Sequence, residues 1–223
     1  MKFFHLLSSL PPALASGASV FLLAVSACAS PISIPSVSPA DPGDILYQDE
    51  FDNNTTGWDR VSNANGIMDY DGGGYRILIQ QPSFNLWSTP EKNFSDVRVE
   101  ADVTKLNGPD ENRAGLMCRY QNGDYYFFII SSDGFYAIGK FIGGNTLLLG
   151  QTEMQTSEFI QVNGINHLRA DCIGNTLSFY VNFNEVAVVQ DTDFPSGDVG
   201  VLAGAFAEPG VDVLFDHFVV IQP

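Results

Sequence analysis

Apolar and polar residues alternate along most of the chain past residue 44, a pattern typical of β-strands with one face toward a core. The segment 97–103 shows the pattern clearly, because its sequence VRVEADV places apolar residues at odd positions and charged residues at even positions. The alternation predicts strands over 45–51, 75–80, 96–106, 113–120, 125–131, 135–142, 167–173, 176–183, 186–190, 199–206 and 211–221.

Short runs rich in glycine, asparagine and aspartate separate these segments, for example at 71–74, 122–124, 143–145 and 174–175. Such runs are typical of tight turns between strands. About eleven to thirteen strands at this spacing, with no helical periodicity between them, predict an all-β fold. We expect an antiparallel two-sheet sandwich of jelly-roll type, formed by one domain over residues 44–223.

The same alternation assigns side chains to faces. It places Leu116, Cys118 and Tyr120 on the inward face of their strand and Met117 and Arg119 on the outward face. The segment 125–130 differs, because its sequence YYFFII is apolar at every position. This indicates either a central strand covered on both sides or a strand whose outer face is lined by aromatic side chains.

The first 27 residues have the order of a secretory signal, with Lys2, an apolar run over 20–25 and small residues behind it. The run is too short to span a bilayer comfortably. The sequence at 25–28, VSAC, resembles the bacterial lipobox, which implies cleavage before Cys28 and lipidation of that residue. An ordinary cleaved signal, with Cys28 incidental, is the alternative.

Residues 28–43 combine prolines at about every fourth position with intervening serines. Such a segment favours extended geometry and cannot bury a core, so we expect a tether that begins at the lipidated cysteine. The membrane would then be a partner only through the lipid anchor, and the domain would lie exported on the outer side of a bacterial membrane.

The net charge of the chain argues against one class of binding partner. The formal net charge is −16, from 26 acidic and 10 basic residues. A field of this sign repels phosphate backbones, so we expect no binding to nucleic acid. We also expect a monomer.

The predicted domain resembles the concanavalin A-like lectin and glucanase superfold, and particularly its laminin G-like and glycoside hydrolase family 16-like modules. The segments that carry the resemblance are Asp49-Glu50-Phe51-Asp52 with Gly57-Trp58, 114–120 followed by 125–127, 166–170 with Gly174-Asn175, and 197–200 ahead of Phe215-Asp216-His217-Phe218. The fold hosts lectins, hydrolases and spacers, so the resemblance speaks to architecture more than to activity.

The resemblance implies a ligand surface on a concave sheet. If the strands are neighbours, the outward side chains would supply a candidate set for binding sugars through aromatic faces and hydrogen bonds to hydroxyls: Arg98, Glu100, Arg119, Tyr126, Arg169, Asp171 and Tyr180. The alternative is a solvated face held by cross-strand ion pairs.

Family 16 enzymes carry Glu-x-Asp-x-Glu on one strand, because a retaining mechanism needs two carboxyl groups about 5 Å apart. The nearest match begins at Glu100 and Asp102 but has Thr104 where the second glutamate should stand. The family 16 motif is therefore not found, and we name no catalytic residue. A hydrolase or lyase of another kind, such as the 3-keto-disaccharide hydrolase modules of similar fold, stays open.

Two further candidates concern metals and cysteines. Related modules often hold a structural calcium ion where the first and last strands meet, and the carboxylates available there are Asp49, Glu50, Asp52 and Asp216. These residues could instead cap turns. Lipidation of Cys28 would leave Cys118 and Cys172, both on inward faces, either to pair as a disulfide or to remain two buried thiols.

Three functions therefore follow from the sequence as hypotheses. The first is a surface lipoprotein whose jelly roll binds a glycan or another cell-surface polymer without catalysis. The second is a carbohydrate-active enzyme that uses the same concave face. The third is a structural or adhesive module that binds protein.

Overall fold

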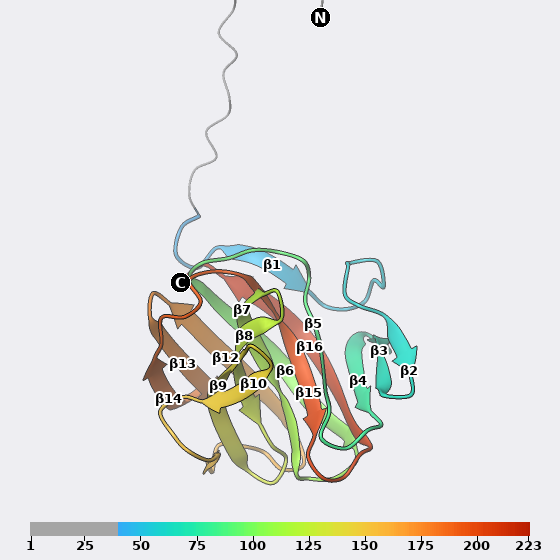
Figure 1. Cartoon of the computed structure of the whole chain (residues 1–223). Coiled ribbons are helices and arrows are strands. Elements are labelled where there is room, and N and C mark those ends of the chain that lie inside the picture. The colour runs from blue at the N-terminus through green and yellow to red at the C-terminus, as the bar shows by residue number, and fades with distance from the viewer. Residues whose placement is uncertain (1–39) are drawn as a thin grey trace, which may run out of the picture. The chain divides into compact units, whose positions relative to one another are not determined.

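The computed structural model describes residues 40–223, which form sixteen β-strands in two antiparallel sheets (Figure 1). The predicted signal segment, Cys28 and most of the predicted tether lie outside the described residues. Within residues 40–223 no helix is long and apolar enough to cross a membrane. The fold is the all-β concanavalin A-like sandwich that the alternation and the resemblance predict.

The larger sheet has nine strands. Along the sheet, the hydrogen-bonded order is β14 (Asn184–Gln190), β13 (Thr176–Val181), β12 (Ile165–Ile173), β6 (Val97–Asn107), β16 (Val211–Ile221), β4 (Gly74–Ile79), β3 (Gly66–Asp71) and β2 (Val61–Asn63). The ninth strand, β1 (Ile45–Asp49), pairs with β16. The first and last strands of the domain are therefore neighbours (Figure 1).

The smaller sheet has seven strands. Its order is β10 (Asn145–Leu148), β9 (Phe135–Ile142), β8 (Asp124–Ile130), β7 (Asn112–Gln121), β15 (Asp198–Ala205) and β5 (Asn85–Ser88), and β11 (Gln155–Thr156) pairs with β9. Consecutive strands β7, β8, β9 and β10 are joined as hairpins, which fits the turn sequences between them.

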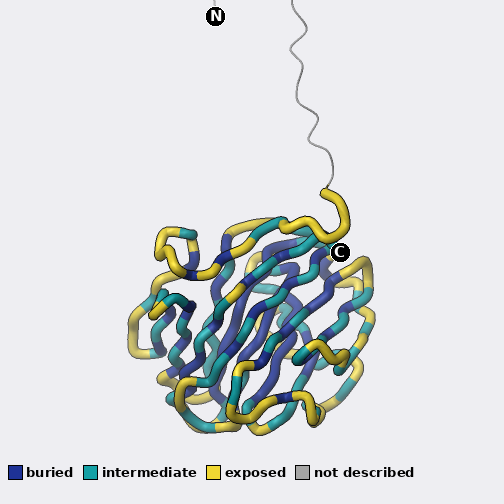
Figure 2. Tube along the Cα trace, turned by 180° about the vertical axis from the view of Figure 1, so that it is seen from behind, coloured by how far each residue is buried: buried dark blue, intermediate teal, exposed yellow. Residues whose placement is uncertain are grey.

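Apolar side chains from both sheets fill the space between them. Buried residues follow the middle of the strands, and exposed residues gather at the turns (Figure 2). In β6 the alternation is regular, with Val97, Val99 and Ala101 fully buried in this core. Burial of this apolar surface is the main force that holds the two sheets together.

A disulfide bond joins Cys118 of β7 to Cys172 of β12, with their Cα atoms 6.9 Å apart. The two strands belong to different sheets, so the bond is a covalent link across the core. Both residues are fully buried, as their inward positions in the alternation require.

Each of the eleven predicted segments contains a strand, but the structure has five strands that the alternation does not reveal: β2, β3, β5, β10 and β11. Four of them are only two to four residues long, and β3 contains two aspartates in its six residues. Such segments are too short or too polar for a period of two to stand out.

Candidate functional site

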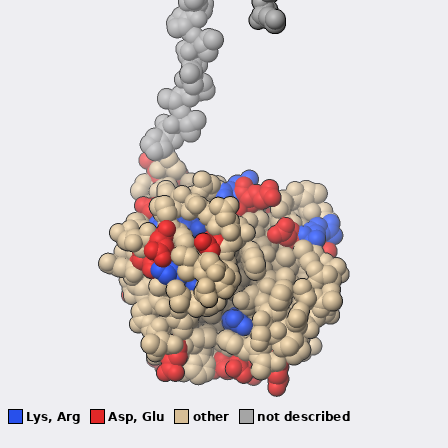
Figure 3. All heavy atoms as spheres, viewed as in Figure 1, with Lys and Arg blue, Asp and Glu red and all other residues tan. Residues whose placement is uncertain are grey.

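A pocket of about 240 Å³ lies on the outer face of the seven-stranded sheet, away from the core between the sheets. Three side chains of β8 form its base, namely Tyr125, Phe127 and Ile129. The other lining residues are Asn85, Arg113, Phe141, Thr146, Leu148, Met154, Leu202 and Phe206. The space-filling view shows a hollow on the face toward the viewer, with a basic side chain beside it and acidic side chains on the surrounding surface (Figure 3).

The pocket exists because β8 is apolar on both faces. Tyr126 and Phe128 point into the main core, whereas Tyr125 and Phe127 belong to a second apolar cluster on the outer face. The neighbouring strand β9 makes room for this cluster at Gly139, where a Cβ atom would lie 2.2 Å from Cζ of Phe127. Residues 125–130 are all buried and the outer face of β8 is lined by aromatic side chains, so the structure combines the two alternatives for this segment.

Aromatic rings from four strands meet above this sheet. Tyr125 of β8 lies 6.0 Å from Trp87 of β5 and 6.0 Å from Tyr120 of β7, measured between ring centroids. Its ring stacks on Phe141 of β9 with a centroid distance of 5.5 Å and an interplanar angle of 19°. Burial raises the pKa of Tyr125 to about 12, so its hydroxyl group stays protonated at neutral pH.

Arg113 brings a positive charge to the wall of this apolar pocket. Its Nη2 donates to the carbonyl oxygen of Ala205 at 2.5 Å, and its guanidinium carbon lies 4.2 Å from the ring centroid of Phe206. Burial lowers the pKa of Arg113. Within residues 40–223, its Nε and the Oδ1 of Asn85 are buried without a hydrogen-bond partner.

The described side chains that line the pocket include no carboxyl group, imidazole or thiol. Glycoside hydrolysis by a pair of carboxylates therefore has no residues to perform it there. The polar groups present are guanidinium, amide and hydroxyl groups, which bind ligands by hydrogen bonds. The arrangement is suited to holding a ligand with an apolar face.

The sequence-predicted ligand set lies largely elsewhere, on the outer face of the nine-stranded sheet. Arg98 and Glu100 of β6, Arg169 and Asp171 of β12 and Tyr180 of β13 come together there because these three strands are neighbours. The charged side chains among them form ion pairs with one another, since Arg98 Nε lies 3.2 Å from Asp171 Oδ1 and Arg169 also pairs with Asp171.

Tyr180 completes this network. The guanidinium of Arg169 lies 4.3 Å from its ring centroid, and its hydroxyl group donates to Glu185 at 2.8 Å. The face therefore has the geometry of a solvated surface held by cross-strand ion pairs, the alternative to a ligand surface.

Arg119 and Tyr126 do not reach either outer face, and their predicted placement beside Arg98 is wrong. Both belong to the seven-stranded sheet and point into the interior, where Arg119 is 2% exposed and Tyr126 is fully buried. The hydroxyl group of Tyr126 donates to Asp191 at 2.6 Å and accepts from the amide of Phe194.

A bulge in β7 explains the reversal at Arg119. Its φ of 55° interrupts the alternation, and the register with both neighbouring strands shifts at this point. As a result, Tyr120 lies with the outer aromatic cluster rather than inward, as the alternation predicts. The guanidinium of Arg119 instead donates to the carbonyl groups of Ser95, Phe194 and Cys172 and lies 3.3 Å from Asp96.

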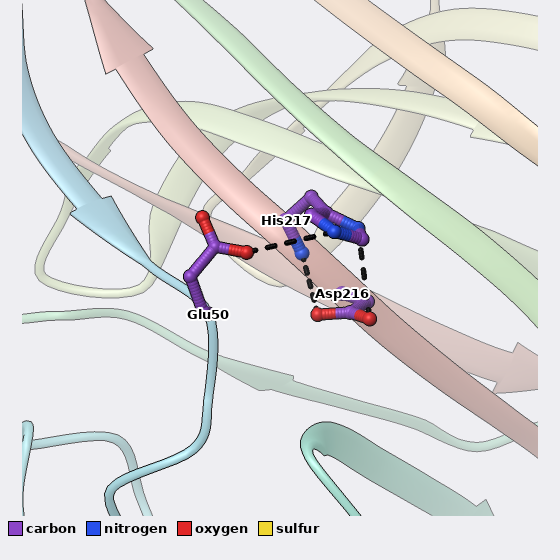
Figure 4. A group of neighbouring side chains, drawn as sticks. All are labelled: Glu50, Asp216 and His217. Atoms are coloured by element: carbon purple, nitrogen blue, oxygen red, sulfur yellow. Dashed lines mark hydrogen bonds and ion pairs between the residues drawn. The ribbon is translucent and has the colours of Figure 1, made fainter.

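The four predicted calcium ligands do not converge. Asp49 is buried and accepts hydrogen bonds from the amide of Phe51 and from Nε1 of Trp58, so it organises the chain after β1. Asp52 lies beside the turn at Gly73 instead. Glu50 and Asp216 do come close, but their shared neighbour is His217 (Figure 4).

In this trio, His217 Nε2 lies 3.6 Å from Glu50 and its Nδ1 lies 3.5 Å from Asp216. Calcium prefers six to eight oxygen ligands. Two carboxylates and an imidazole do not fit that preference, so the described residues do not form the expected calcium site, and we derive no role for the ion.

A second histidine lies on the same face of the nine-stranded sheet. His167 Nδ1 lies 2.8 Å from Asp102 Oδ1, and its Nε2 lies 3.4 Å from Glu100. The hydrogen bond with Glu100 is the main cause that raises the pKa of His167, and the same bond lowers the pKa of Glu100.

We predict that this pair makes the stability of the domain depend on pH. Because the folded-state pKa of His167 is raised, its contribution is complete below the ordinary value of 6.5 and is lost as the pH rises through the folded-state pKa. The lowered pKa of Glu100 has the opposite effect, so its contribution is complete above 4.5 and is lost toward acid.

The measurement is the free energy of unfolding against pH. It should fall in the wild-type protein as the pH rises above the ordinary histidine value of 6.5, and His167→Gln should flatten that fall. His217→Gln removes the other histidine near the same carboxylate, since His217 Nδ1 lies 3.3 Å from Asp102, and this variant should keep the fall. An equal slope in the wild type and in His167→Gln would contradict the prediction.

The comparisons with known proteins identify the fold and no family. No family model matches the chain, and no curated protein matches it. Among solved structures, the carbohydrate-binding module CBM66 from Bacillus subtilis is similar with a TM-score of 0.61 and 19% identity, over 75% of this chain and 97% of that one.

Two further structures show the range of proteins that share the architecture. A Bacillus subtilis protein of unknown function with a galectin-like fold has a TM-score of 0.62 and 12% identity, over 82% of this chain and 97% of the other. A β-glucanase from Bacillus licheniformis has a TM-score of 0.57 and 12% identity, over 79% and 97%. At these identities the similarity shows the fold alone.

Proposed function

We propose that this domain binds carbohydrate in the pocket on the outer face of the seven-stranded sheet. The observation that carries the proposal is a pocket lined by the aromatic side chains of Tyr125, Phe127 and Phe141, whose polar groups include Asn85 and Thr146. Sugars present C–H faces that pack on aromatic rings and hydroxyl groups that need hydrogen bonds. The likeness in fold to a carbohydrate-binding module supports the same ligand class.

The pocket favours binding over catalysis. Its lining has no pair of carboxyl groups, and its volume of about 240 Å³ suits a small part of a ligand, since sites for drug-sized molecules measure roughly 300–1,000 Å³. A single sugar ring of a longer chain would occupy it, while the rest of the glycan would lie along the open surface.

We also propose that the protein is exported and carries a lipid. The disulfide between Cys118 and Cys172 is typical of an oxidising compartment, which supports export directed by the signal sequence. Attachment of lipid to Cys28 would hold the glycan-binding domain at the outer side of a membrane, with the proline-rich segment as its tether. We propose that the domain acts there as a monomer.

The test compares the two outer faces. Phe141→Ala should weaken retention on the bound glycan by about 10- to 100-fold, because loss of the ring removes roughly 1–3 kcal/mol of contact. Tyr180→Ala, on the face with the ion-pair network, is the matched control and should bind as the wild type does. Affinity electrophoresis on a panel of polysaccharides identifies the glycan, and calorimetry measures the change.

Two outcomes would count against the proposal. If Tyr180→Ala lost binding and Phe141→Ala kept it, the ligand face would be the nine-stranded sheet. If the wild-type protein were retained on no polysaccharide, carbohydrate binding itself would be wrong. The unfolding midpoint of each variant shows whether a loss of binding reflects a loss of folded protein.

A further inference from the structure

Arg113 differs from the other basic side chains of the domain in how its charge is balanced. Within residues 40–223, seven of the nine basic side chains lie within ion-pair distance of a carboxylate. The two others are Lys92, which is exposed, and Arg113, which lies in the wall of the apolar pocket. Arg113 is therefore a partly buried cation without a carboxylate partner in a strongly acidic protein.

The contacts that Arg113 does make leave much of its binding capacity unused. A guanidinium has five N–H donors, and the described structure gives that of Arg113 one hydrogen bond, from Nη2 to Ala205. The ring of Phe206 offers a cation–π contact, which supplies less than a desolvated carboxylate partner would. An unpaired charge in apolar surroundings is costly, so a ligand that completes the pairing gains affinity.

Asn85 lies beside Arg113 and adds a second donor. Its Oδ1 and the Nε of Arg113 both lie within 3.2 Å of the position that a Cβ atom would occupy on Gly204. Because this amide oxygen is buried, the amide nitrogen is the group left for the pocket, where it makes no hydrogen bond to the described residues. The pocket therefore has an aromatic floor and adjacent N–H donors, and its described lining residues include no carboxylate.

We propose that the pocket selects a sugar residue that carries a carboxylate, a uronic acid, and that Arg113 and Asn85 bind this carboxylate. The inference rests on the proposed function, because the sugar ring enters the same aromatic pocket and packs on Phe141. A planar carboxylate matches the planar guanidinium and amide, whereas a neutral sugar leaves the charge of Arg113 unpaired.

The negative charge of the protein distinguishes specific binding of an acidic glycan from nonspecific attraction. The net charge of −16 repels polyanions, so nonspecific attraction cannot account for retention on an acidic glycan. Salt screens this repulsion between exposed charges more than it screens a desolvated ion pair in the pocket. Retention on an acidic glycan should therefore persist or strengthen from low to physiological salt.

The experiment uses the exported protein and matched pairs of glycans. A panel of uronate-containing polysaccharides is compared with the same polysaccharides after reduction of their carboxyl groups to alcohols, which keeps the ring and removes the charge. We expect the wild-type protein to bind at least one acidic member about 10- to 100-fold more tightly than its reduced form. Arg113→Met should bind the two forms about equally, and Arg113→Lys should recover part of the preference.

The outcomes separate this inference from the proposed function. Equal binding of the acidic and reduced forms by the wild type, with binding lost in Phe141→Ala, would overturn the uronate inference and leave carbohydrate binding in place. Retention only on sulfated or neutral glycans would overturn it in the same way. Retention on no glycan would overturn both. Since the wild-type comparison needs no variant, the result does not depend on the folding of Arg113→Met.

Discussion

Replacing both Cys118 and Cys172 with alanine is expected to lower the free energy of unfolding by about 4 kcal/mol. The bond closes a loop with a sequence separation of 54, and the chain-entropy estimate for a loop of that length is about 4 kcal/mol. Both sulfur atoms are fully buried, so the small cavities left by alanine add to the loss. Denaturant unfolding of the oxidised wild type and the double variant measures the difference.

Two comparisons make this result specific to the disulfide. Reduction of the wild-type protein should produce most of the same loss, because it breaks the bond and keeps the side chains. Cys28→Ala should leave the free energy of unfolding unchanged, because residue 28 precedes the domain. Equal denaturation midpoints for the oxidised and reduced wild type would show that the bond contributes little to stability.

Arg119→Met is expected to destabilise the domain by roughly 3 kcal/mol or more. Removing the guanidinium takes away its hydrogen bonds to the carbonyl groups of Ser95, Phe194 and Cys172, and a buried acceptor left unsatisfied costs about 1–3 kcal/mol. The ion pair with Asp96 is the smaller contribution, because that carboxylate is 44% exposed and is solvated without Arg119.

Arg98→Met is the matched control. Arg98 lies on an outer face, and Asp171 keeps Arg169 as a partner when Arg98 is replaced, so the loss should stay within about 1 kcal/mol. Thermal or denaturant unfolding compares the two variants. If Arg119→Met kept wild-type stability and lost glycan retention, Arg119 would act at the ligand after all, as the sequence alone indicates.

The sequence predicts the architecture well because the alternation reflects burial directly. In β6 and β12, apolar residues at every second position must face the core, whatever the order of the strands. The same reasoning places Cys118 and Cys172 inward. Their pairing could not be predicted, because it depends on β7 and β12 facing each other across the core, and strand order is a property of the whole fold.

Arg119 shows where alternation fails. A positive φ at a non-glycine residue is unfavourable in isolation, and here it is sustained by the carbonyl groups that surround the guanidinium. Those groups come from segments more than 20 residues away along the chain. No local signal marks the bulge, so a period of two assigns both Arg119 and Tyr120 to the wrong face.

The apolar sequence of β8 does indicate that the outer face of this strand is unusual. A strand that packs on the main core needs only one apolar face. A second apolar face therefore indicates either a covering layer or a binding surface. The residues that surround Tyr125 in space could not be predicted from the sequence. Trp87 lies on a four-residue strand that the alternation misses, and Arg113 is the second residue of β7, whose other end holds the more conspicuous Arg119.

The pairing of β1 with β16 also bears on how this domain could be moved between proteins. The amide of Gly43 donates to the carbonyl oxygen of Gln222 at 2.8 Å, so the chain enters and leaves at one corner (Figure 1). A domain whose ends meet can be spliced into a surface loop of an unrelated host without stretching either partner. A short glycine linker between these ends, with a new opening at the hairpin of Gly174, would give a circular permutant that keeps the pocket intact.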